Sequence, residues 1–309
     1  MSFAIETRDL NYSYARDRKS VNNLSLQVPS GSIYGFLGPN GAGKTTTIRL
    51  LTGMLLSDKD NVFIQGKSLQ KNLPEIFSSM GTLIEMPSLY LHLSGKENLR
   101  LIATMRGIPR NRIDDALQTA GLAAVANKKA KQYSLGMKQR LGIAMAMLSD
   151  PELLILDEPA NGLDPTGIIE VRELLIRLNK ERGKTIFVSS HLLGEVEKTC
   201  THIGIIHHGI MRYNGTLEQM KASAYTAADV IFKVPGAEHW LPQITPQYPY
   251  AKTQGSDEIT LPATSREEVT HINQQLVRMN IPVAGIQLRG GLEEWFMHII
   301  DQEKDKQIL

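Results

Sequence analysis

The chain has 309 residues, 42% of them hydrophobic and 21% charged, and its formal net charge is +2. These values are typical of a globular protein with one large domain and a small one, and they exclude a polycationic nucleic-acid-binding chain. The single cysteine, Cys200, excludes an intramolecular disulfide and fits a reducing cytosol.

No apolar run in the sequence approaches the ~18 to 20 residues that a membrane span requires. The N-terminal stretch carries charges where a signal peptide needs an apolar core. We therefore expect neither a membrane span nor a nucleic-acid partner, and we expect any work at a membrane to go through another subunit.

Short apolar stretches alternate with polar residues over positions 2–30, which predicts antiparallel strands. We place Tyr12 and Tyr14 in the turn between these strands. An aromatic ring there can stack on a purine base. On these two residues alone, however, a half-buried tyrosine at a strand end is the favoured alternative.

The run Ile33–Leu37 predicts a buried strand, and a helix is expected to begin near Gly43. Between them Gly38 to Thr45 follow the Gly-x-x-x-x-Gly-Lys-Thr pattern of a phosphate-binding loop. Glycines let successive N–H groups face one anion, and the helix N-terminus adds positive charge. Lys44 supplies an ammonium for the β- and γ-phosphates, and the Thr45 hydroxyl can ligate Mg²⁺. The predicted nucleotide contacts of this loop are Gly38, Pro39, Asn40, Gly41, Ala42, Gly43, Lys44, Thr45 and Thr46.

Two short strands, Val62–Ile64 and Thr82–Ile84, precede a region of helical pattern over about residues 94–150. Ser94, spaced as a capping box with Glu97, is expected to begin one helix, and Ser134 is expected to cap another.

The apolar run Leu153–Leu156 is typical of a central parallel strand, and it delivers Asp157 and Glu158 to the sheet edge where open α/β folds bind ligands. Asp157 can hold Mg²⁺ through water, opposite Thr45. Glu158 is placed to polarise an attacking water as general base. A solvated strand end is the weaker alternative, because four apolar residues lead straight into the pair. With the phosphate loop, these carboxylates predict a site for ATP hydrolysis.

An amphipathic helix over residues 167–182 and a buried strand, Thr185–Ser189, lead to His191. His207 and His208 stand between two apolar runs, where they predict a hairpin turn. A metal site is the less favoured alternative, because cysteine or acidic companions at ligand spacing are missing from the pattern.

Prolines and both tryptophans gather after about Tyr225, where the pattern predicts strand, strand, a helix capped by Ser265, strand and helix. We therefore predict a nucleotide-binding domain over residues 1–224, with a helical subdomain over about residues 86–150. An accessory α+β domain is expected over residues 225–309.

The stretch Ser134-Leu135-Gly136-Met137-Lys138-Gln139-Arg140 resembles the signature of ATP-binding-cassette ATPases. Asn161-Gly162-Leu163-Asp164 resembles their D-loop, His191 their switch histidine, and Tyr14 their adenine-stacking aromatic, with Tyr12 as second choice. The resemblance covers about residues 3–220. It implies an α/β fold: a P-loop ATPase core with a mixed sheet, an antiparallel β subdomain and a helical subdomain that carries the signature.

The resemblance also implies ATP and Mg²⁺ as cofactors, with Lys44, Glu158 and His191 as catalytic residues. In that family two cassettes dimerise head to tail, and each signature faces the phosphate loop of its partner. Ser134, Gly136 and Asp164 are therefore expected to contact nucleotide held by a second copy of the chain. A helix N-terminus capped by Ser134 is suited to that second anion site.

Two features depart from the usual family pattern: the signature reads Tyr-Ser-Leu-Gly-Met where the family usually has Leu-Ser-Gly-Gly-Gln, and the Q-loop glutamine is replaced. Met137 replaces the signature glutamine, and Glu85 stands where most relatives carry the Q-loop glutamine, as an expected nucleotide contact and Mg²⁺ ligand. Both features are similar to the branch that exports bacitracin- and lantibiotic-like peptides through a separate permease. The stretch Leu292–Phe296 is similar to the Leu-Glu-x-x-Phe tails of the wider exporter group.

The resemblance thus implies a transporter subunit that hydrolyses ATP to power export through an integral membrane permease, with antimicrobial peptides as the substrate class. We expect it in the cytoplasm, peripheral on the inner face of the cell membrane. The alternative is a soluble ATPase of the same superfamily with a role in DNA repair or translation. Repair members insert long coiled coils between the phosphate loop and the carboxylate pair, which in this chain are Lys44 and Asp157. Translation members carry two cassettes with a basic linker. This chain has neither feature. A non-catalytic regulator would need a damaged site.

Overall fold

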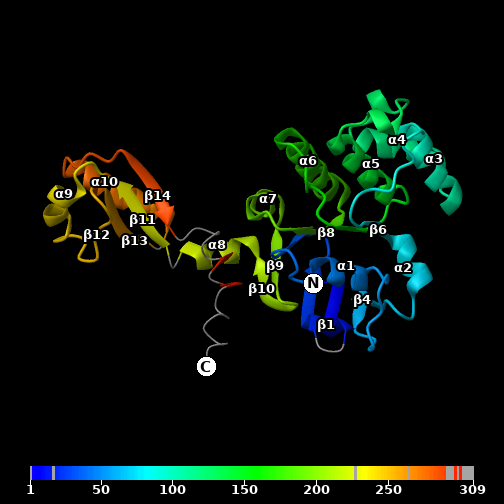
Figure 1. Cartoon of the computed structure of the whole chain (residues 1–309), viewed down its shortest axis with the longest axis horizontal. Coiled ribbons are helices and arrows are strands. Elements are labelled where there is room, and N and C mark those ends of the chain that lie inside the picture. Colours follow the sequence, from blue (N-terminus) through cyan, green and yellow to red (C-terminus); the bar gives the residue numbers. More distant parts are fainter. Residues whose placement is uncertain are drawn as a thin grey trace. The chain divides into compact units, whose positions relative to one another are not determined.

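The computed structural model describes residues 2–15, 18–225, 228–263, 265–289, 296–297 and 299–300. The chain divides into two compact units, residues 1–216 and 217–309, which Figure 1 shows coloured along the sequence. Helix α8, Leu217–Tyr225, belongs to the second unit, so the division falls eight residues before the predicted boundary at 224/225.

An antiparallel sheet in the order β2-β1-β4-β5 opens the first unit. Its strands are β1 (Phe3–Ala15), β2 (Arg18–Pro29), β4 (Val62–Ile64) and β5 (Lys67–Ser68). The placement of Tyr12 and Tyr14 in a turn is wrong. Both lie in β1, because the β1–β2 pairing continues through Tyr12 opposite Val21 to Ala15 opposite Arg18.

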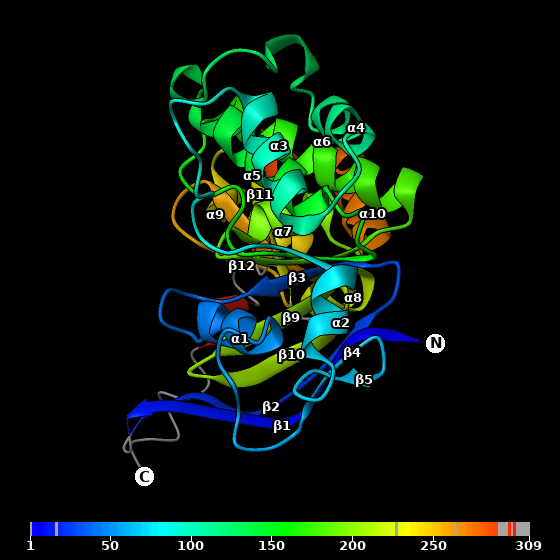
Figure 2. The same ribbon diagram turned by 90° about the vertical axis from the view of Figure 1, so that its right-hand side faces the viewer.

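The main sheet has the order β10-β9-β3-β8-β7-β6, with parallel neighbours except for the antiparallel pair β9–β10. Its strands are β3 (Ile33–Leu37), β6 (Met80–Leu83), β7 (Leu153–Leu156), β8 (Thr185–Ser190), β9 (His202–His207) and β10 (Ile210–Thr216). It is the predicted mixed sheet. Helix α1 (Lys44–Leu51) lies between this sheet and the β1–β2 sheet (Figure 2).

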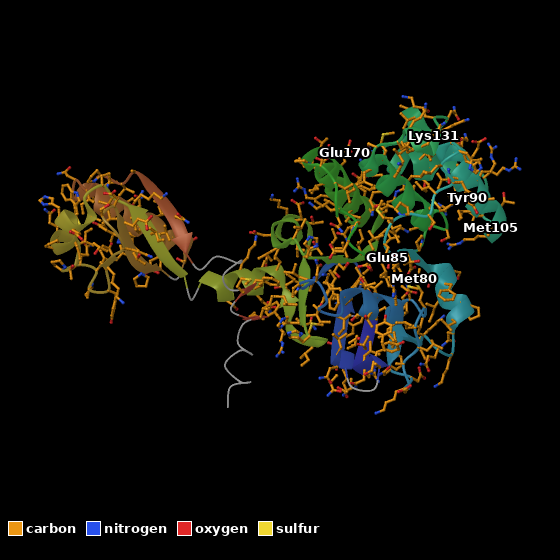
Figure 3. All side chains as sticks on the ribbon, viewed as in Figure 1. Met80, Glu85, Tyr90, Met105, Lys131 and Glu170 are labelled. Atoms are coloured by element: carbon orange, nitrogen blue, oxygen red, sulfur yellow. The ribbon has the colours of Figure 1, made fainter. Side chains whose placement is uncertain are left out.

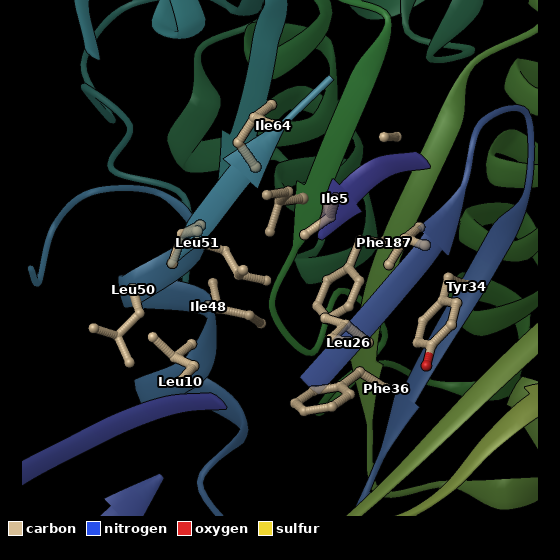
Figure 4. Close-up of a cluster of buried hydrophobic side chains, with 14 of the residues drawn as sticks. Ile5, Leu10, Leu26, Tyr34, Phe36, Ile48, Leu50, Leu51, Ile64 and Phe187 are labelled. Carbon is tan, nitrogen blue, oxygen red and sulfur yellow. The ribbon is translucent and has the colours of Figure 1, made fainter. Parts of the chain in front are cut away.

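The core of the first unit fills the space on both sides of α1, as Figure 4 shows. Ile48 and Leu51 of α1 are fully buried there between side chains of the two sheets. The rings of Tyr34 and Phe187 stack with centroids 5.7 Å apart and planes 8° apart. Burial of a large apolar side chain stabilises the fold by about 1.5–3 kcal/mol. The helix that follows the phosphate loop is therefore firmly packed in the core.

The helical subdomain has a core of its own, which includes Leu99, Leu117 and Leu141. Its elements are α3 (Gly95–Arg106), α4 (Asn111–Thr119), the 3-10 turns Ala123–Val125 and Ala130–Gln132, and α5 (Leu135–Met147). The predicted capping box of Ser94 and Glu97 is present at α3. The remaining helices of the first unit are α2 (Leu73–Ser79), α6 (Pro165–Arg182) and α7 (Leu193–Thr199).

The second unit follows α8 with the order β-α-β-β-α-β, and its sheet has the order β12-β13-β11-β14. This is the ferredoxin-like arrangement. Its elements are β11 (Ala228–Lys233), α9 (Ala237–Ile244), β12 (Lys252–Thr253), β13 (Glu258–Ala263), α10 (Arg266–Arg278) and β14 (Gly285–Arg289). Sequence analysis missed α9, because Pro242 lies inside it. Apart from Phe296, the stretch Leu292–Phe296 lies outside the described residues.

Within the described ranges, the structure has no helix that combines the length and the apolar character needed to cross a membrane.

Candidate active site

The loop between β3 and α1 depends on glycine at two points where the backbone is crowded. A Cβ on Gly38 would lie 2.4 Å from the Ile206 carbonyl oxygen, and one on Gly43 would lie 2.5 Å from the Ser20 carbonyl oxygen. Gly43 also has φ 107°, outside the range that suits other residues. The next residue, Lys44, begins α1, so free N–H groups of the first helical turn face the loop. The local geometry is that of an anion cradle.

Lys44 is buried, with 6% of its surface exposed. Its Nζ donates to the carbonyl oxygens of Gly38 at 2.7 Å and Pro39 at 3.3 Å, and it forms an ion pair with Glu158 Oε1 at 3.2 Å. A buried ammonium needs such partners, because an unpaired charge away from water is very costly. The cation is therefore held at the loop, next to the predicted general base.

Asp157 joins the phosphate loop to two strands. The Thr45 hydroxyl donates to its Oδ2 at 2.9 Å, and the Ser189 hydroxyl donates to its Oδ1 at 2.5 Å. Ser189 is fully buried at the end of β8. Sequence analysis did not predict Ser189 as a site residue. Its position in a buried strand, two residues before His191, could have indicated it.

Glu158 follows Asp157 with φ 46°, a left-handed conformation uncommon for residues other than glycine. Its N–H donates to the Ser189 hydroxyl at 2.9 Å, and its Oε2 lies 2.8 Å from His191 Nδ1. The strained backbone thus turns the carboxylate toward both Lys44 and His191. Residues far apart in the chain meet at the carboxyl ends of β3, β7 and β8.

These groups border a cleft of about 750 Å³. Ten predicted residues line it: Tyr14, Pro39, Asn40, Gly41, Gly43, Lys44, Thr45, Thr46, Glu158 and His191. Gly38, Ala42 and Asp157 lie buried just behind this lining. The other lining residues, which sequence analysis did not assign to the site, are Ala15, Lys19, Ser20, Asn161, His208 and Gly209.

Tyr14 rather than Tyr12 lines the cleft, and it is 58% exposed. Its ring packs edge-on against Tyr12, whose side chain lies against the core. A hydrogen bond with Tyr14 and a second with Glu85 raise the pKa of Arg49 in α1. Arg49 Nη2 donates to Glu85 Oε1 at 2.7 Å. Glu85, labelled in Figure 3, therefore lies beside α1, and it is not among the residues that line the cleft.

Ser134, Gly136 and Asp164 are also outside that lining. Ser134 caps α5, where its Oγ accepts from the Met137 N–H at 3.2 Å, and Asp164 caps α6 through the Gly167 N–H at 3.0 Å. A Cβ on Gly136 would lie 3.4 Å from Gly167 Cα, so the two capped helix starts lie together. They form a separate surface from the cleft.

Comparison with known proteins identifies the family in which this combination of phosphate loop, carboxylates and capped helices occurs. The family profile described as "ABC transporter" matches residues 21–161. The bacitracin transport ATP-binding protein BcrA of Bacillus licheniformis is 50% identical over 210 residues, which cover 68% of each chain. The chain belongs to the ABC transporter family.

One further sequence and one solved structure are also similar to this chain. The lantibiotic transport ATP-binding protein SrtF of Streptococcus pyogenes is 41% identical over 205 residues, 66% of this chain and 87% of SrtF. The ATP-binding cassette MJ0796, in a dimeric structure of a post-hydrolysis state bound to ADP and Pi, has a TM-score of 0.61 at 25% identity over 69% of this chain and 98% of its own. The predicted family and fold class are confirmed.

The cassette's residues fit ATP and Mg²⁺. The glycine cradle, the α1 N-terminus and Lys44 suit a chain of phosphates, and the cleft has room for a nucleotide. Thr45 and Asp157 offer adjacent oxygen ligands of the kind that Mg²⁺ prefers. In the described part of the chain, no group of three or more His, Cys, Asp or Glu side chains is placed to hold a metal by itself. Mg²⁺ characteristically takes few protein ligands and completes its shell with phosphate and water.

Proposed function

We propose that the chain is an ATP-hydrolysing subunit of an exporter, and that it binds ATP with Mg²⁺ in the cleft beside the phosphate loop. The observation that carries this proposal is that two bonded groups of side chains follow the ends of neighbouring strands. Glu158 pairs with both Lys44 and His191, and the Thr45 hydroxyl donates to Asp157. Such an arrangement holds a triphosphate, a metal and a water nucleophile at one place.

Each side chain has a role that follows from its contacts. Lys44 binds the β- and γ-phosphates, and when they enter, its ion pair with Glu158 is exchanged for them. Glu158 then accepts a proton from the attacking water, and His191 holds the Glu158 carboxylate in place through Oε2. Thr45 and Asp157 would hold the Mg²⁺, which would supply electrostatic stabilisation of phosphate charge. Ser189 fixes both carboxylate residues from behind.

We further propose that two copies dimerise head to tail around ATP. The starts of α5 and α6, with Ser134, Gly136 and Asp164, form a surface of N–H groups outside the chain's own cleft. Such a surface suits the γ-phosphate of another copy. The dimeric MJ0796 structure supports the proposal at the level of the family.

A permease subunit is the proposed membrane partner, which would place the chain on the cytoplasmic face of the membrane. Two adjoining clefts of about 580 and 260 Å³ share Thr82 and Arg106 in their lining. Their edges include Met54, Phe77 and Met86, which are 65%, 48% and 58% exposed. A patch of exposed apolar side chains indicates a contact surface for another protein. In the described residues Arg106 has no ion-pair partner, so an apolar permease segment with an acidic residue would fit.

For the transported molecule, we propose peptide antibiotics of the bacitracin or lantibiotic type, because BcrA and SrtF are transport proteins for these compounds by name. The first test is phosphate release by the purified chain with Mg·ATP, with Lys44→Ala as the inactive control. The second is co-expression with a permease and measurement of resistance to bacitracin and to a lantibiotic. Hydrolysis without binding to any permease would favour a soluble ATPase with another role.

A further inference from the structure

The turn between β9 and β10 is attached to the phosphate loop. The Gly209 N–H donates to the Ala42 carbonyl oxygen at 2.8 Å, and the Gly209 carbonyl oxygen accepts from the Asn22 N–H, also at 2.8 Å. A Cβ on Gly209 would lie 2.7 Å from the Ser20 carbonyl oxygen, so the turn is tightly enclosed. The turn therefore has a fixed position between the phosphate loop and β2.

His208 occupies this turn with φ 48° and lines the cleft. Its ring centroid lies 4.0 Å from that of His207. A left-handed residue other than glycine is uncommon, and glycine would adopt this backbone without strain. A strained residue that borders a binding cleft is reason to examine its side chain for a role in binding.

The location of His208 within the cleft indicates which part of a nucleotide it faces. Lys44, Glu158 and His191 form one connected group at the end where the γ-phosphate is expected. Gly209, the next residue after His208, is held instead beside Gly43 and the β1–β2 hairpin, and this hairpin carries Tyr14. The nucleoside end of ATP is expected there, so we expect His208 near the junction of α-phosphate and ribose.

We propose that His208 is a further nucleotide-binding residue, whose imidazolium donates a hydrogen bond to the α-phosphate of ATP or ADP. The inference rests on the proposed function. An imidazole can carry a proton near neutral pH, and a hydrogen bond from a charged donor to phosphate is about twice as strong as a neutral one. Among the described side chains, the charged or titratable groups that line the cleft are Tyr14, Lys19, Lys44, Glu158 and His191, and His207 packs beside the His208 ring.

The two lysines among these neighbours already have other hydrogen-bond or ion-pair partners. Two of the three protons of the Lys19 ammonium are directed at Asn11 Oδ1 and Asn22 Oδ1, each at 3.2 Å. Lys44 is held among Gly38, Pro39 and Glu158 at the other end. His208 is therefore suited to supply positive charge at the α-phosphate.

The test is calorimetric binding of ATP and of ADP to the full chain at pH 6 and pH 8. The variant is His208→Asn, because asparagine tolerates the left-handed backbone but carries no charge. We expect affinity for both nucleotides to fall roughly three- to tenfold at pH 6, as for one charge-assisted hydrogen bond, and less than about twofold at pH 8. His271→Asn, at an exposed position on α10, is the matched control and should bind like the wild type at both pH values.

The pH effect has a definite sign. A contact made by the protonated ring strengthens binding at low pH and is lost as the pH rises. His191 also lines the cleft, so only the difference between wild type and His208→Asn is assigned to His208.

Three results would overturn the inference: unchanged affinity of His208→Asn at pH 6, a loss of equal size at both pH values, or a loss confined to ATP. If His208→Asn unfolds at a lower temperature than wild type, His208→Gly replaces it, because glycine relaxes the turn. A wild-type chain that binds neither nucleotide would refute the proposed function itself, which is a distinguishable outcome.

Discussion

Glu158 combines a strained backbone with two basic contacts, Lys44 Nζ at 3.2 Å and His191 Nδ1 at 2.8 Å. A solvated carboxylate at a strand end would need neither contact. Because Lys44 is buried, the negative charge of Glu158 stabilises its ammonium as well as serving the proposed reaction. The same residue therefore connects the stability of the loop with its chemistry.

Glu158→Gln should keep the shape of the side chain and lose its basicity. We expect phosphate release to fall by at least ~100-fold, as on removal of a general base, while Mg·ATP still binds and holds a dimer. Size-exclusion chromatography with Mg·ATP and a phosphate assay measure the two effects. Glu152→Gln, at the opposite end of β7, is the control and should hydrolyse normally. A Glu158→Gln protein that stays monomeric with ATP would contradict the assigned role.

Glu85 lies in an ion pair with Arg49 in which the Glu85 side chain is 63% exposed and the Arg49 side chain 37% exposed. Such a pair is worth at most ~1 kcal/mol, so Mg²⁺ or a permease can displace it. We expect Glu85→Gln to keep the basal ATPase of the isolated chain within about tenfold, a change of ~1.4 kcal/mol in barrier. Glu85→Ala, reconstituted with a permease, should hydrolyse ATP and transport poorly.

The ratio of transport to ATP hydrolysis decides the role of Glu85. Equal ratios for wild type, Glu85→Gln and Glu85→Ala would make the residue a bystander. Arg49→Gln separates two explanations, since it removes the ion pair and leaves the carboxylate for Mg²⁺. If Arg49→Gln lowers the ratio as Glu85→Ala does, the ion pair itself is responsible.

At the scale of elements, α3 and α5 each begin with a serine N-cap, which in α3 is part of a capping box, and the two caps can be compared. Ser94 accepts from the Glu97 N–H at 3.2 Å, and Ser134 accepts from the Met137 N–H at 3.2 Å. Both caps satisfy an N–H group that the helix leaves without a partner. Ser134 alone stands in the stretch that resembles the family signature.

Ser94→Ala and Ser134→Ala should each lower the free energy of unfolding by about 1 kcal/mol, as expected for loss of an N-cap. Only Ser134→Ala should weaken the ATP-dependent dimer, tested in the Glu158→Gln background. Urea unfolding measures the first effect and analytical ultracentrifugation with Mg·ATP the second. If the two variants dimerise equally well, Ser134 has a capping role alone.

At the scale of the whole molecule, each unit has its own apolar core. The second unit buries Phe232, Ile259 and Leu276 in one cluster between its sheet and its helices α9 and α10. Every residue of the candidate active site lies before residue 217. We propose that residues 225–309 form an accessory domain that changes dimer affinity or coupling to the permease.

Removal of residues 225–309 should leave a folded ATPase, because the cleft and the core around α1 are retained. We expect nucleotide affinity within about twofold of the full chain and a changed dimer affinity, on the grounds that sites with separate cores act nearly independently. Circular dichroism, calorimetry and ultracentrifugation measure the three properties. Loss of soluble expression would mean that the two parts share stability and that the boundary is wrong.

Local patterns in the sequence determined much of this protein. The order of phosphate loop, signature stretch, carboxylate pair and histidine is a property of the chain alone, and so are the caps of α3 and α5. Strand β7 is apolar throughout because both its faces are buried, which made it recognisable. These features depend on interactions among residues close together in the chain.

Contacts between distant residues required the tertiary structure. The Ser189 hydroxyl reaches Asp157 only because β8 lies beside β7, and Glu85 meets Arg49 only because β6 ends near α1. Tyr14 extends a strand because of its pairing with β2, and α9 forms around an internal proline over a core from three other elements. His208 reaches the cleft because its turn is bonded to Ala42. A side chain's neighbours across a sheet are set by strand order and register, which no short stretch of sequence contains.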